Sequence, residues 1–84
     1  MRDNGKATKE AMLSVIKDIG DYNDIVKQEL EAIMTEIDAL STIWKDDKYN
    51  QFIEHVSDMR SSLLDELTIL ENARHQLQTK VDLM

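Results

Sequence analysis

The sequence contains no cysteine and no proline, and only two of its 84 residues are glycine. Without cysteine there is no disulfide framework, no thiol nucleophile and no cysteine-ligated zinc site. Strands joined by tight turns depend on glycine, proline and Asn-Gly pairs, so the shortage of these residues disfavours an all-β or α/β fold. A chain of this length holds one small core. We therefore expect residues 1–84 to form a single all-α domain.

The sequence also lacks long apolar runs and an excess of positive charge. Its apolar runs reach three residues, whereas a membrane-spanning helix needs roughly 20, so no membrane insertion is expected. The first ten residues, MRDNGKATKE, do not resemble a signal peptide, which predicts a cytoplasmic protein or one secreted without an N-terminal signal peptide. Ten basic residues against 17 acidic ones give a net charge of −7, and no basic patch offers a site for nucleic acid.

Apolar residues recur every seven positions in both halves of the chain, a spacing that places them along one face of a helix. We call two such rows the seam rows; they contain Met12, Ile19, Val26, Ile33 and Leu40 in the first half, and Val56, Leu63, Leu70 and Leu77 in the second. A companion row in the first half contains Ile16, Asn23, Leu30, Ile37 and Trp44, and a flanking row in the second contains Ile53, Arg60, Leu67, Arg74 and Val81. The seam rows are the predicted core or dimer contact.

The periodicity breaks once, around residues 44–50. Asp46 and Asp47 lie there, and Asp is a residue type that caps helix starts. We predict a helix over about 7–43, a bend over about 44–47 and a helix over about 47–82. Helices of matched length joined by a short connection predict an antiparallel helical hairpin. A single continuous coiled coil is the competing structure.

The apolar stripes are wider than a two-helix contact can cover, which predicts that two hairpins pair as a four-helix bundle dimer. Because the seam rows are nearly free of charge, a homodimer is the expected form. The alternative is a heterodimer with a related hairpin or an effector. Asn23 is the polar member of its row and is either a surface residue or a buried residue that sets register. Gly20 is either a tolerated defect or a point of close backbone approach.

Residues of the kinds that carry catalysis or bind metals are not grouped by their spacing. His55 and His75 lie about 30 Å apart along one predicted helix, so they do not share a metal ion. Ser, Thr and acidic residues are plentiful, but none is linked by spacing to a base and an orienting partner. We expect a protein that acts through protein–protein interaction, with no enzymatic activity, no cofactor and no metal site.

The bend resembles that of the WXG (ESAT-like) proteins, small helical hairpins of type VII (ESX) secretion systems. Leu40, Trp44 and Phe52 match that family's leucine, tryptophan and downstream aromatic residue, while Asp46 occupies the glycine position of Trp-x-Gly. The resemblance implies a substrate, partner or chaperone in type VII-like secretion. The family's Tyr-x-x-x-Asp/Glu export signal is absent after the second predicted helix. A cytoplasmic structural or adaptor coiled coil is the alternative, and a small acidic regulator that sequesters a basic partner is a third hypothesis.

Overall fold

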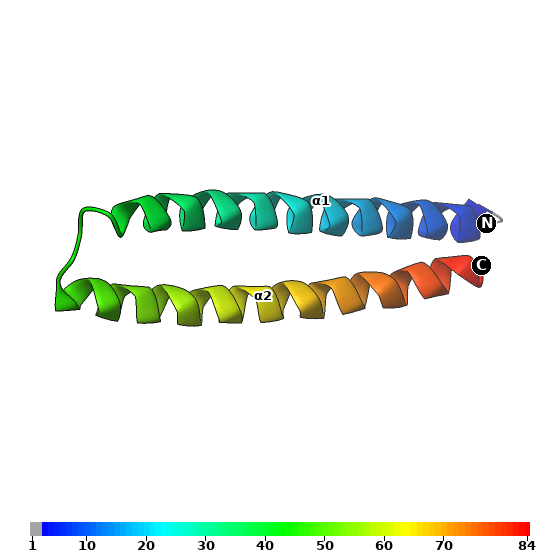
Figure 1. Cartoon of the computed structure of the whole chain (residues 1–84). Helices are drawn as coiled ribbons and strands as arrows, with labels where there is room; N and C mark the ends of the chain where they lie inside the picture. The colour runs from blue at the N-terminus through cyan, green and yellow to red at the C-terminus, as the bar shows by residue number, and fades with distance from the viewer. Residues whose placement is uncertain (1–2) are drawn as a thin grey trace.

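Two long antiparallel helices form the protein in a computed structural model that describes residues 3–84 (Figure 1). Helix α1 spans Asp3–Leu40 and helix α2 spans Asp47–Asp82. They lie side by side as a rod of 66 × 17 × 16 Å, with both termini at one end and the bend at the other. The predicted helical hairpin is thereby confirmed, and the continuous coiled coil is wrong.

Helix α1 begins four residues earlier and ends three residues earlier than the expected range of 7–43. Just beyond its end, the side chain of Thr42 donates to the carbonyl of Ala39 at 2.8 Å. The backbone N–H of Trp44 then donates to the carbonyl of Leu40 at 3.0 Å, which closes the last turn. Such local bonds compete with continuation of the helix. Residues 41–46 therefore connect the helices, and α2 starts at Asp47.

The hydrophobic core is small and lies along the line where the helices meet. Within the described part of the chain, the buried hydrophobic side chains are those of Ile16, Leu67 and Val81. Ile16 belongs to the companion row of α1, whereas Leu67 and Val81 belong to the flanking row of α2. The line of closest packing thus runs beside the seam rows, whose members are half-buried or exposed.

Neither helix contains, between residues 3 and 84, an apolar stretch long enough to cross a lipid bilayer.

Candidate interaction surface

The bend is built from aromatic side chains around one carboxylate. The Trp44 ring lies 5.5 Å from the rings of both Tyr49 and Phe52, edge-on to the first and tilted against the second. The Trp44 indole N–H donates to Asp46 Oδ1 at 2.9 Å. The same oxygen accepts the backbone N–H groups of Lys48 at 2.9 Å and Tyr49 at 3.3 Å. Asp46 is therefore the N-cap of α2, and it ties the tryptophan to the start of that helix.

A polar cluster joins the two helices in the middle part of the rod. Asn23 is 4% exposed, and its Nδ2 donates to Glu71 Oε2 at 3.2 Å. Arg74 holds Glu71 through two hydrogen bonds, one from Nε to Oε2 at 2.9 Å and one from Nη2 to Oε1. The hydrogen bonds from Arg74 are the main reason why the pKa of Glu71 lies below its ordinary value. Asn23 is thus a buried residue of the helix contact and not a surface residue.

The buried amide of Asn23 is only partly satisfied. Its Oδ1 has no hydrogen-bond partner within residues 3–84. A buried acceptor without a donor destabilises the folded state by roughly 1–3 kcal/mol. The unpaired oxygen therefore offsets part of what the Asn23–Glu71 hydrogen bond contributes to stability.

Gly20 lies one turn before Asn23 and does not mark a close approach of two backbones. A Cβ atom built there would have as its nearest neighbour a guanidinium nitrogen of Arg74, at 4.0 Å. This is ordinary contact, so an alanine fits at position 20 without rearrangement. Its interpretation as a tolerated defect in the helix is the one that agrees with the structure.

One side of the hairpin carries an open, largely apolar groove between the helices. Four of its side chains are more than half exposed: Tyr22 and Ile33 at 52%, Met59 at 71% and Ile69 at 68%. We call this surface the apolar groove; its lining is Tyr22, Leu30, Ile33, Met34, Ile37, Phe52, Val56, Asp58, Met59, Arg60, Ser62, Leu63, Glu66, Leu67, Ile69, Leu70 and Ala73. Its larger hollow, toward the bend, has a volume of about 650 Å³.

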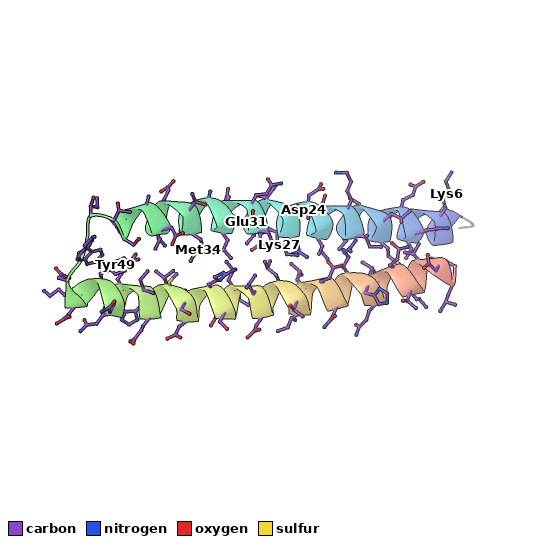
Figure 2. The ribbon with its side chains drawn as sticks, viewed as in Figure 1. Lys6, Asp24, Lys27, Glu31, Met34 and Tyr49 are labelled. Carbon is purple, nitrogen blue, oxygen red and sulfur yellow. The ribbon has the colours of Figure 1, made fainter. Side chains whose placement is uncertain are left out.

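The opposite side of the rod carries a groove of different character. We call it the polar groove; its lining is Lys27, Leu30, Glu31, Met34, Thr35, Asp38, Arg60, Leu64, Leu67, Thr68, Glu71 and Asn72. Met34 extends from α1 toward α2 between the two surfaces (Figure 2). Charges of both signs mix along this groove, so its surface suits contact with water. The hairpin is therefore two-sided.

The structure distributes the seam residues unevenly. Met12, Ile19, Val26, Leu40 and Leu77 are half-buried along the helix contact. Ile33, Val56, Leu63 and Leu70 line the apolar groove. The seam rows contain these residues but not Tyr22, Ile69 or Glu66, which also line the apolar groove. Tyr22 stands with Val15 on the flank of the first seam row, and that flank was the available sign of a second contact.

The described residues offer no arrangement suited to metal binding. No three His, Asp or Glu side chains in that part of the chain converge as a metal site requires. Both histidines are exposed. The surface that distinguishes this molecule is the apolar groove.

Comparison of the chain with protein-family models, curated proteins and solved structures found no significant match.

Proposed function

We propose that this protein is a pairing module, a helical hairpin that works by packing its apolar groove against the helices of another polypeptide. One observation carries the proposal. A rod with three buried hydrophobic residues in its described part leaves four large side chains of one groove more than half exposed. Single exposed apolar residues are common on proteins, but a continuous apolar strip marks an interaction surface. Packing a second helical element over the strip adds the core that the hairpin lacks.

Pairing takes one of two forms. Two copies packed groove to groove would make the four-helix bundle homodimer that the charge-poor seam rows favour. Its mass would be near twice 9.7 kDa, and its unfolding midpoint would rise with protein concentration. The other form is a heterodimer with a related hairpin or an effector.

Site-specific cross-linking tests the pairing. A photo-reactive amino acid replaces Met59, which is 71% exposed in the apolar groove, or Thr68, which is exposed in the polar groove. We expect irradiation of cells to give a defined protein adduct from position 59 and little or none from position 68. Equal yields at both positions, or no adduct at position 59, would contradict the proposal.

The bend supports a more specific form of this function, namely a WXG-like partner, substrate or chaperone in type VII-like secretion. Asp46 caps α2 and accepts a hydrogen bond from the Trp44 indole, two contacts that a glycine at this position lacks the side chain to make. The Trp-x-Asp sequence is therefore compatible with a tight bend of the WXG kind. The cytoplasmic adaptor is the alternative, because it needs the same hairpin and the same groove.

Export is tested in a cell that encodes this protein beside an FtsK/SpoIIIE-type ATPase. Deletion of the ATPase gene should remove the protein, or the partner it escorts, from the culture medium while its level inside the cells is maintained. If the chain and its cross-linked partner stay with the cells in both strains, the adaptor function is correct.

A further inference from the structure

Carboxylates stand along both edges of the apolar groove. Asp58 and Glu66 line it from α2. On α1, Glu29 and Glu36 follow Tyr22 at seven-residue steps, so they lie outside the lining itself, on the flank of the helix from which Tyr22 enters the groove. All four carboxylates belong to exposed residues. The apolar groove thus has carboxylates in its lining on α2 and, outside the lining, on the Tyr22 flank of α1.

The register of the hairpin sets these carboxylates in pairs. Asn23 bonds to Glu71, so these two residues stand at the same level of the rod. Because the helices are antiparallel, a residue n positions after Asn23 on α1 stands at the level of the residue n positions before Glu71 on α2. Carboxylates at equal distance from this bond, to within one residue, stand at the same level of the rod on the two helices. These pairs are Glu29 with Glu66 and Glu36 with Asp58.

The pairs lie on either side of Ile33, near the middle of the groove, and this placement opposes self-pairing. Two copies packed groove to groove in parallel would bring each pair against itself. Two antiparallel copies would bring one pair against the other. Arg60 is the cation in the lining, and it is shared with the polar groove. In either orientation carboxylates meet carboxylates. Like charges across an interface weaken it, so they disfavour a second copy of this chain as the partner.

We infer that the occupant of the apolar groove is an amphipathic helix whose apolar stripe is flanked by Lys or Arg residues, in place of a second copy of this chain. The inference rests on the proposed pairing function and names its partner by charge. The stripe covers the strip around Ile33 and Met59, and flanking cations reach the carboxylates on both edges. The net charge of −7 also favours a basic partner, because it attracts a basic helix and speeds its association with the hairpin.

Two synthetic helical peptides test the inference with the full-length chain. They share one stripe of Leu and Ile and differ only in the flanking positions, which are all Lys in one peptide and all Glu in the other. We expect the Lys-flanked peptide to bind at least tenfold more tightly at 50 mM salt, measured by fluorescence anisotropy. Because the carboxylates are exposed, the difference should shrink severalfold at 500 mM salt.

Matched variants locate the charge effect. Glu29→Gln with Glu66→Gln removes two carboxylates beside the apolar groove, and the preference for the Lys-flanked peptide should fall below threefold. Glu31→Gln with Asp38→Asn removes the same charge from the polar groove and should leave the preference intact. Circular dichroism verifies that both variants keep their helices.

Three results would overturn the inference. Equal binding of both peptides would refute the basic partner while leaving the pairing function standing. Failure of both to bind, or binding that Met59→Glu does not weaken, would refute the pairing function as well. A homodimer that forms at low salt, and that Glu29→Gln with Glu66→Gln does not strengthen, would show that a second copy is the occupant.

Discussion

The bend and the middle of the rod are held together in different ways. At the bend, Trp44 and Asp46 bond to each other and to residues within the same short segment. In the middle, Asn23 meets Glu71 across 48 positions of sequence, and one amide oxygen remains without a partner. Local contacts complete the first region, whereas the second is a sparse long-range contact beside an open apolar groove. The bend is therefore held by its own contacts, whereas the middle of the rod gains the most buried apolar surface when a partner helix binds.

The largest expected effect comes from breaking the bend. Trp44→Ala removes the ring that contacts Tyr49 and Phe52, and it should lower the free energy of unfolding by about 2–3 kcal/mol, because Trp44 is half-buried. Urea unfolding followed by circular dichroism measures the change. Trp44→Phe keeps one aromatic ring at this position and loses the bond to Asp46 and part of the packing, so its loss of stability should be less than half as large. A loss below about 0.5 kcal/mol for Trp44→Ala would show that the bend is not held by its aromatic side chains.

The cap of α2 gives the next effect. Asp46→Ala removes the acceptor of three N–H groups and should lower the free energy of unfolding by about 1 kcal/mol. Asp46→Gly, which recreates Trp-x-Gly, should lose less. Asp47→Ala serves as the control, because Asp47 does not cap the helix. Equal midpoints in urea for Asp46→Ala and the unchanged chain would contradict the role of the cap.

Substitution of the buried Asn23 tests the middle of the rod, where we expect stability to increase. Asn23→Leu removes the unpaired oxygen and keeps the branched shape of the side chain, so the free energy of unfolding should rise by about 1 kcal/mol. Loss of the polar contact should also broaden the distribution of oligomers seen in sedimentation. Asn23→Ala, which opens a void, should not stabilise. A less stable Asn23→Leu would show that the bond to Glu71 outweighs the unpaired oxygen.

The smallest effect concerns pH. Hydrogen bonds from Arg74 lower the pKa of Glu71 from its ordinary value of 4.5 in the folded chain. Ionised Glu71 therefore stabilises the fold above pH 4.5, and this contribution is lost as the pH falls through the lowered pKa. Glu71→Gln should be less stable than the unchanged chain at pH 7, and the difference should disappear as the pH falls below the lowered pKa of Glu71. A difference that stays constant across this range would show that Arg74 does not act through the charge of Glu71.

The hairpin was predictable because its signals are local. Seven-residue spacing and a single break around Trp44 predict two helices and a bend. The residue type of Asp46 suggested a cap, although Asp47 was an equal candidate until the hydrogen bonds were seen. The end of α1 at Leu40 was missed, because hydroxyl bonds such as that of Thr42 leave no trace in an apolar pattern.

The surface was less predictable, since adjacent rows of a wide stripe look alike in sequence. The rows of Ile16 and Leu67 form the closest contact, although Arg60 and Arg74 made the latter row look peripheral. The link from Asn23 to Glu71 depends on register, which no local pattern encodes. Glu66 interrupts the row of Phe52, Met59 and Ala73, so nothing in that row indicates that its carboxylate lines the apolar groove.

Methyl NMR tests the apolar groove as the pairing surface most directly. Methyl groups of Ile, Leu and Met residues report separately on the two grooves of one labelled sample. During titration with the Lys-flanked peptide, we expect shifts at Ile33, Met59 and Ile69 of the apolar groove. The signals of Leu64, which lines the polar groove, should keep their positions. Shifts centred on Leu64, or unchanged signals at Ile33, Met59 and Ile69, would contradict the account.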